Sequence, residues 1–185
     1  VGDSVWVKTG SYVPGTSQLA SFQLPSEVAV VGGFLGHEIS LGGWEPFAWP
    51  CSLKSPDGVV SNNLVTVPSG RRGASLVGFH LTSCGDGAIW ATGAEFTLSQ
   101  CLFTGNHASS TFGSCCRATK CTVSVERCAF LNNDGVAVFL DSTDATIVNS
   151  VFHGNGGGTY GHDIRTDWST AMLMNCTFGE PTQGA

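Results

Sequence analysis

Apolar and small residues recur along the second half of the chain in a fixed local pattern. Phenylalanines anchor it at Phe103, Phe130, Phe152 and Phe178, and an earlier copy has Leu81 in the same place. Successive anchors are separated by 22 to 27 residues. Repeats of this length are typical of stacked units, each of which cannot bury its apolar face alone.

Each unit contains material for two or three short strands. The residues five and two positions before the anchors are apolar or small: Leu98, Val125, Ile147 and Leu173, then Cys101, Cys128, Ser150 and Cys176. The anchor and the residue two before it share one face of a strand, whereas the residue five before it has the opposite parity. This predicts a bend between them. Further strand-like segments lie at 87–94, 135–143 and 162–170.

A unit of this length suits one circuit of a coil in which equivalent strands pair in parallel about 4.8 Å apart. The pattern therefore predicts an all-β protein, a single-stranded right-handed parallel β-helix of about six or seven rungs. Segments 3–8, 27–34 and 63–70 extend it toward the N-terminus. We expect one domain over 1–185, with an irregular excursion at about 36–58 whose Trp44, Phe47 and Trp49 pack over the coil.

Equivalent residues of such a coil stack along its axis. The four phenylalanines are expected to form an internal ring column. Asn106, Asn133 and Asn155, three residues after their anchors, are expected at left-handed corners, with each side-chain amide bonded to the next. Cys101, Cys128 and Cys176 are expected in one inward column. We interpret all three columns as scaffold.

The cysteine pattern leaves the redox state open. Cys101 and Cys128 on adjacent rungs would be close enough for a disulfide, although buried thiols are favoured. Cys115, Cys116 and Cys121 are expected in a longer turn, where one local disulfide is possible. None has spacing typical of a zinc site.

Composition narrows the class of partner. The chain has 25 Gly and only 12% charged residues, and its formal net charge is −6. Eight Lys and Arg provide no stripe for phosphates, so a nucleic-acid partner is not expected. No apolar stretch approaches the roughly 20 residues of a transmembrane span. The chain begins at Val1 with an even number of cysteines, from which we expect a processed N-terminus and export or an organelle lumen.

Acidic residues provide the best candidates for chemistry. Asp141 and Asp167 occupy the same position relative to their anchors, so they are expected on adjacent rungs, with Asp163 and Arg165 nearby. Asp144 and His162 lie close in sequence. Paired carboxylates could act as acid and base in glycoside cleavage, or bind calcium. A solvated polar face is the favoured interpretation, because earlier rungs have Thr92 and Thr119 in the same position.

Three segments support a family resemblance. "GDSVWVKTGSY" (2–12) and "VVGGFLGHEISL" (30–41) resemble segments of bacterial surface proteins with pectin-lyase-like β-helices. "GAIW" and "FTGN" resemble the GGAI and FxxN repeats of chlamydial polymorphic outer membrane proteins. The resemblance implies a β-helix that serves in some members as a surface protein or adhesin, and in others as a polysaccharide lyase or hydrolase.

These observations favour a non-catalytic structural or interaction module. We expect no cofactor and no metal, and we expect the module to be a subunit or adhesive part of a larger assembly. Other protein subunits are the expected partners, and a polysaccharide is possible. The alternative is a carbohydrate-active enzyme, with Asp141, Asp163, Asp167 and Arg165 in its site, or a glycan-binding protein.

Overall fold

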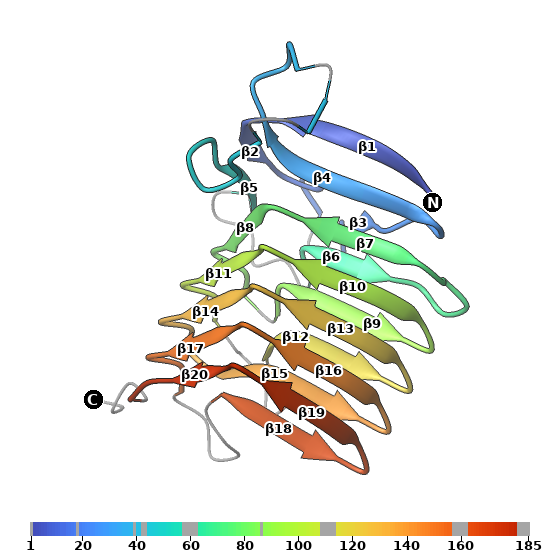
Figure 1. The fold of residues 1–185 in the computed structure, drawn as a ribbon, viewed down its shortest axis with the longest axis vertical. Coiled ribbons are helices and arrows are strands. Elements are labelled where there is room, and N and C mark those ends of the chain that lie inside the picture. Colours follow the sequence, from blue (N-terminus) through green and yellow to red (C-terminus); the bar gives the residue numbers. More distant parts are fainter. Residues whose placement is uncertain are drawn as a thin grey trace.

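The chain winds through three parallel sheets (Figure 1). The computed structural model describes residues 2–17, 19–38, 40–41, 44–56, 63–85, 87–107, 114–156 and 163–180. The first sheet contains β1 (Asp3–Lys8), β4 (Val28–Phe34), β7 (Ala74–Val77), β10 (Glu95–Ser99), β13 (Thr122–Glu126), β16 (Asp144–Val148) and β19 (Thr170–Met174). The second contains β2 (Gly10–Tyr12), β5 (Cys51–Lys54), β8 (Phe79–Thr82), β11 (Leu102–Thr104), β14 (Ala129–Leu131), β17 (Val151–His153) and β20 (Thr177–Phe178). The third contains β3 (Phe22–Gln23), β6 (Val65–Val67), β9 (Ile89–Thr92), β12 (Ser114–Thr119), β15 (Val136–Asp141) and β18 (Ile164–Asp167).

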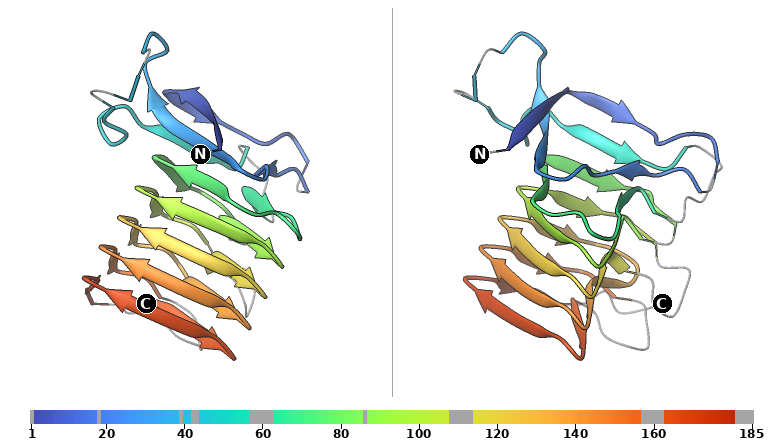
Figure 2. Two further views of the ribbon diagram at one scale, coloured as in Figure 1. Left: turned by 45° about the vertical axis from the view of Figure 1, so that its right-hand side comes forward. Right: turned by 90° about the vertical axis from the view of Figure 1, so that its right-hand side faces the viewer.

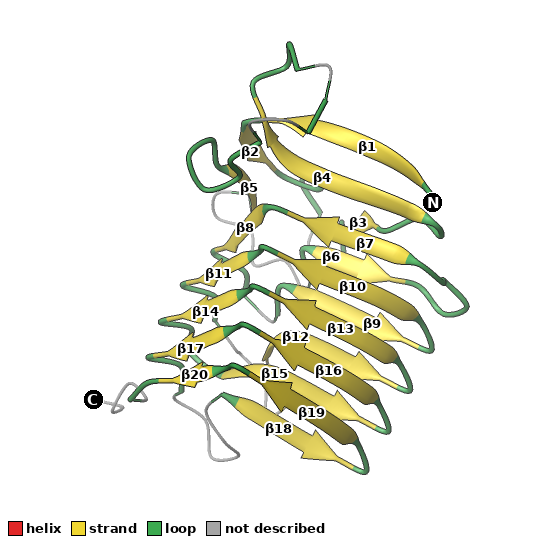
Figure 3. Cartoon of the chain, viewed as in Figure 1, coloured by secondary structure: helices red, strands yellow, loops and turns green. Residues whose placement is uncertain are grey.

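Every strand pairs in parallel with the strand three places along the chain. Two sheets have seven strands and the third has six, so the described chain makes six complete turns and two strands of a seventh. The turns stack along one axis, as both views in Figure 2 show. Figure 3 shows strands and loops but no helix in the part of the chain that the structure describes. The prediction of an all-β, right-handed parallel β-helix is confirmed.

Each regular turn bends at three corners, and a residue with positive φ occupies each corner. Between the first and second sheets these residues are Gln100, Arg127, Asn149 and Asn175, with φ of 52° to 53°. They lie three residues before the anchors, which places the predicted bend. Equivalent residues follow the second sheet at Ser83, Gly105, Asn132 and Gly154, and the third sheet at Gly93, Lys120, Ser142 and Trp168.

The asparagine column differs from its prediction in one respect. Asn106, Asn133 and Asn155 do not have positive φ; the left-handed residue is the one before each of them. Their side chains instead point inward and are buried. Asn106 Nδ2 donates to Asn133 Oδ1 at 3.0 Å, and Asn133 Nδ2 donates to Asn155 Oδ1 at 2.8 Å. Their role is thus side-chain hydrogen bonding, because the preceding residue already makes the left-handed turn.

A side-chain oxygen from the next turn accepts a backbone N–H at all three types of corner. Asn133 Oδ1 accepts from the N–H of Asn106 at 3.1 Å. Thr143 Oγ1 accepts from the N–H of Cys121 at 3.1 Å, and Ser150 Oγ accepts from the N–H of Cys128 at 3.2 Å. A corner N–H points away from the strand ladders, so these bonds satisfy donors that the sheets leave unpaired.

The core is a column of rings surrounded by aliphatic side chains. Phe103, Phe130 and Phe152 are fully buried, and their centroids lie 4.5 Å and 5.0 Å apart. Phe178 continues the stack 5.1 Å from Phe152, but it is half-exposed because no described turn lies beyond it. Leu98, Val125 and Ile147 are completely buried in the first sheet.

Two segments differ from their predictions. Cys115 and Cys116 lie in strand β12, not in a longer turn, and Arg117 and Ala118 pair in register with Trp90 and Ala91. The excursion predicted at 36–58 is too long, because Cys51–Lys54 forms strand β5 within the coil. Both strands are specified by pairing with neighbouring turns, which the short segments do not reveal by themselves.

We predict that Asn133→Ala destabilises the protein by about 3 kcal/mol, because it leaves several buried hydrogen-bonding groups unpaired. Chemical denaturation followed by circular dichroism measures the change. The control is Asn175→Ala, whose exposed amide makes one 3.3 Å bond to Asn149. Asn175 has a φ of 52°, so alanine there should cost about 1 kcal/mol, well below the effect at Asn133. Equal effects of the two substitutions would contradict the structural role of the buried column.

Candidate functional site

The outer face of the third sheet carries a stack of aromatic and arginine side chains. Trp90, Arg117, Phe139 and Arg165 are neighbours in register on β9, β12, β15 and β18. The Arg117 guanidinium lies 4.5 Å from the Trp90 ring and 5.4 Å from the Phe139 ring. Arg165 lies 4.7 Å from the other side of Phe139. These cation–π contacts cover Phe139, which is buried although it points away from the coil interior.

The predicted acidic pair lies next to this stack. Asp141 and Asp167 are neighbours in register on β15 and β18, in line with Thr119 and Thr92. Arg165 binds Asp167 through Nη2 to Oδ2 at 2.7 Å and Nε to Oδ1 at 3.3 Å. Asp141 Oδ1 accepts from Ser142 Oγ at 3.0 Å. The structure thus brings together three of the predicted site residues, but Arg165 neutralises one of the two carboxylates.

The other acidic candidates lie elsewhere. Asp163 Oδ1 accepts a hydrogen bond from Asn155 Nδ2 at 3.0 Å. This carboxylate is therefore bonded to the last member of the asparagine column. Asp144 begins β16 on the far side of the corner from Asp141 and is exposed. His162 lies outside the described residues. Within the described ranges, no group of three or more His, Cys, Asp or Glu side chains is close enough to hold a metal ion.

The loop between β4 and β5 is fixed to the coil by an indole and a proline. Trp44 Nε1 donates to the carbonyl of Gly32 at 2.8 Å, and Pro46 is buried. A Cβ at Gly78 would lie 2.7 Å from Trp44 Cζ2 and 2.9 Å from Pro46 Cβ. Gly78 also has a φ of +73°, so both conformation and space require glycine there.

The start of the same loop has its own anchor. The Glu38 carboxylate accepts hydrogen bonds from the N–H groups of Leu35, Gly36 and His37. The bond from Leu35, with those from Gly36 and His37, lowers the pKa of Glu38 to about 2. The loop therefore begins in a turn that stays anchored across the physiological pH range.

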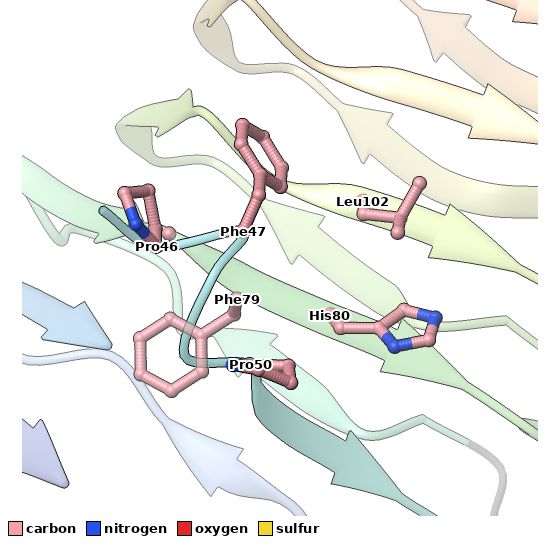
Figure 4. Close-up of a pocket in the computed structure, with 7 residues that line it drawn as sticks. Pro46, Phe47, Pro50, Phe79, His80 and Leu102 are labelled. Carbon is pink, nitrogen blue, oxygen red and sulfur yellow. The ribbon is translucent and has the colours of Figure 1, made fainter. Parts of the chain in front are cut away.

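This fixed loop presents aromatic side chains to solvent. Phe47 is 61% exposed and Trp49 is 45% exposed. Of the three aromatic residues expected to pack over the coil, Trp44 is the one that is half-buried, whereas Phe47 and Trp49 are largely exposed. Phe47 stands above a hollow of about 50 Å³ that Pro46, Pro50, Gly78, Phe79, His80 and Leu102 also line (Figure 4).

The hollow continues into an apolar strip along the outer face of the second sheet. His80, Leu102, Ala129 and Val151 are neighbours in register on four successive strands. Val151 is 40% exposed, and Leu102 and Ala129 are half-buried. We call Phe47, Trp49 and this strip the lateral face. The sequence signal for it was the residue directly before each phenylalanine anchor, which in three successive turns is Leu102, Ala129 and Val151.

His80 is the polar group of the lateral face. Its Nε2 lies 2.6 Å from Thr104 Oγ1, within hydrogen-bonding distance. Burial lowers the pKa of His80, so the imidazole is neutral at pH 7. It can accept or donate one hydrogen bond but carries no charge to attract an anion.

Burial raises the pKa of most of the core cysteines. All eight are thiols in the structure, so the possible local disulfide among Cys115, Cys116 and Cys121 is not formed. Burial raises the pKa of Cys51 to about 11 and that of Cys116 to about 12. Burial also raises the pKa of Cys128 well above its usual value. Buried, protonated thiols of this kind are poor nucleophiles.

A family model described as "Right handed beta helix region" matches residues 55–184. The chain belongs to the right-handed β-helix family. The match covers more than two thirds of this β-helix protein, from the end of β5 through the seventh turn. It fixes the architecture and leaves the activity open, since one fold supports many functions.

A solved structure gives the same fold. A candidate glycosyl hydrolase from Parabacteroides merdae aligns with 96% of this chain and 81% of its own, at a TM-score of 0.63 and 12% identity. At this identity the likeness extends to the fold alone. No curated protein sequence matches the chain. Among the described residues, no helix of the β-helix protein is long and apolar enough to cross a membrane.

We predict that Gly78→Ala releases the β4–β5 loop of the β-helix. The new methyl group would overlap Trp44 and Pro46, at a cost of about 2 kcal/mol beyond the left-handed strain of about 1 kcal/mol. The matched control is Gly70→Ala, which has a φ of +80° but nothing within 4 Å of its Cβ. Denaturation gives the stabilities and tryptophan fluorescence reports the loop; identical results for both variants would contradict the clash.

A thiol titration should give one early reaction and seven late ones. Cys176 is half-buried, whereas the other seven cysteines are buried. In the folded protein at pH 8 a thiol reagent should therefore modify Cys176 first. After denaturation without reductant, all eight should react. A denatured count of six or fewer would show that a disulfide forms.

Proposed function

We propose that this β-helix is a non-catalytic interaction module, exported or lumenal, that joins other protein subunits in a larger assembly. The observation that carries the proposal is the lateral face. Its loop is held by Trp44 and Pro46, yet the same loop leaves Phe47 and Trp49 in solvent. Large aromatic side chains are enriched at the centre of protein interfaces, where they supply much of the binding energy.

The rigidity of the coil favours this use of the lateral face. The parallel ladders fix Leu102, Ala129 and Val151 in a straight line, so a partner would meet a surface already in its bound shape. Preorganisation of this kind reduces the entropy lost on binding. The N-terminal resemblance to bacterial surface proteins supports the proposed location.

The second candidate is a carbohydrate-active enzyme or a glycan-binding protein. Asp141 beside Asp167, with Arg165 in contact, is the arrangement that favours it. The candidate glycosyl hydrolase that has the same fold also supports this second candidate. We place it second because Arg165 engages both oxygens of Asp167, and Asp163 serves the asparagine column.

The decisive experiment compares two pairs of exposed apolar residues in the native host. The variant Phe47→Ala/Trp49→Ala should lose at least about tenfold of its association with the native assembly, measured by gradient sedimentation. The control Met172→Ala/Met174→Ala removes exposed apolar residues of β19 and should leave association unchanged. Full association of the first variant would overturn the proposal.

A parallel assay separates the two candidate functions. The purified chain is incubated with polygalacturonate and related polymers, with and without calcium. The proposal predicts no turnover in any arm. Turnover that Asp141→Ala abolishes would establish the enzymatic alternative instead.

A further inference from the structure

An apolar cavity of about 180 Å³ lies inside the coil near its first turns. All three sheets contribute to it. Its buried wall is formed by Leu24, Leu53, Val65, Leu76 and Phe79. Phe79 also borders the hollow beneath Phe47, but the cavity lies inside the coil and the lateral face lies on the outside of the second sheet.

The cavity exists because the internal ring column stops before it. In register with Phe103, the preceding turns have Leu81 and then Leu53, which fill less of the cross-section. Tyr12 is the next residue in this column. Its hydroxyl donates to the carbonyl of Lys8 at 2.8 Å, which fixes the ring at the rim.

The lining has few side-chain groups that could form hydrogen bonds with a polar ligand. Gln23 is the one side-chain amide among the lining residues, and it is exposed at the rim. The Tyr12 hydroxyl already has its acceptor. A charged or hydroxylated ligand would lose its hydrogen bonds to water without replacement, so a sugar does not fit here.

We propose that this cavity binds a small apolar molecule, namely a single aromatic ring or a short hydrocarbon chain. A dry cavity of about 150 Å³ lined by Leu, Ile and Phe is large enough for benzene, and this one is slightly larger. The half-buried rim, where Val7, Tyr12 and Phe22 lie, provides the entrance. This site goes beyond the proposed interaction role and does not depend on it.

The test uses toluene and benzene with the full chain. Each is titrated while backbone amide resonances are followed by NMR. Saturable shifts are expected for residues around the cavity, such as Leu53, Val65 and Leu76, and none for the distant Phe152. Glucose at the same concentrations should cause no shift. Absence of saturable shifts with both apolar probes would overturn the proposal.

A cavity-filling variant provides the specificity control. Leu53→Phe places a larger side chain in the cavity, so affinity for toluene should fall at least about tenfold while the melting temperature stays equal or rises. If that variant does not fold, Val65→Ile fills the cavity from the third sheet and should also weaken binding. Val151→Phe, on the outer face, should leave affinity unchanged. Unchanged affinity in the folded filling variant would contradict the assignment.

Discussion

The structure depends on hydrogen bonds at its corners, where each turn must both bend and stay above its neighbour. A left-handed residue makes the bend, and the residue after it directs a small side chain inward. Asn133, Thr143 and Ser150 each use that side chain to accept the N–H of the turn before. The bond is possible only when successive turns are in register. Backbone pairing between strands could re-form after a slip along the sheet. A slip would, however, leave the buried corner N–H groups without acceptors, which costs free energy.

Register at the corners determines what the outer faces present. Residues that occupy equivalent positions in different turns become a straight line of side chains. Arg117 is therefore held between the Trp90 and Phe139 rings, and Asp141 lies beside Asp167. The same alignment produces the lateral strip that continues from Phe47. The faces of the coil therefore carry continuous lines of side chains that a partner could contact.

The sequence predicts the regular turns well because their pattern is local and repeated. Phe103, Phe130 and Phe152 have residues of the same class at the same sequence offsets. Strands assigned in one circuit therefore predict the equivalent strands in the other circuits. The corner conformation was harder to predict, because it belongs to residues as different as Gln100, Arg127 and Asn149. Only half of the corner residues are Gly or Asn, the types that favour this conformation, so residue type alone does not identify the corners.

The site was less predictable than the fold for a physical reason. Whether Phe47 packs or is exposed depends on where Trp44 and Pro46 fix a loop that has no repeat to follow. Cys115 and Cys116 resemble a cysteine cluster in sequence, but pairing with β9 makes them strand residues. Asp141 and Asp167 could be aligned from their offsets, yet the ion pair between Arg165 and Asp167 depends on rotamers. Contacts outside the repeat could therefore not be predicted from the sequence alone.

Amide hydrogen exchange measured by NMR tests the corner hydrogen bonds most directly. The N–H groups of Cys121, Cys128 and Asn133 lie in turns but bond to side-chain oxygens of the following turn. They should exchange as slowly as the amides of the central strands, and Thr143→Val should accelerate Cys121 far more than Cys128. Exchange of all three at rates typical of exposed loops would contradict the account.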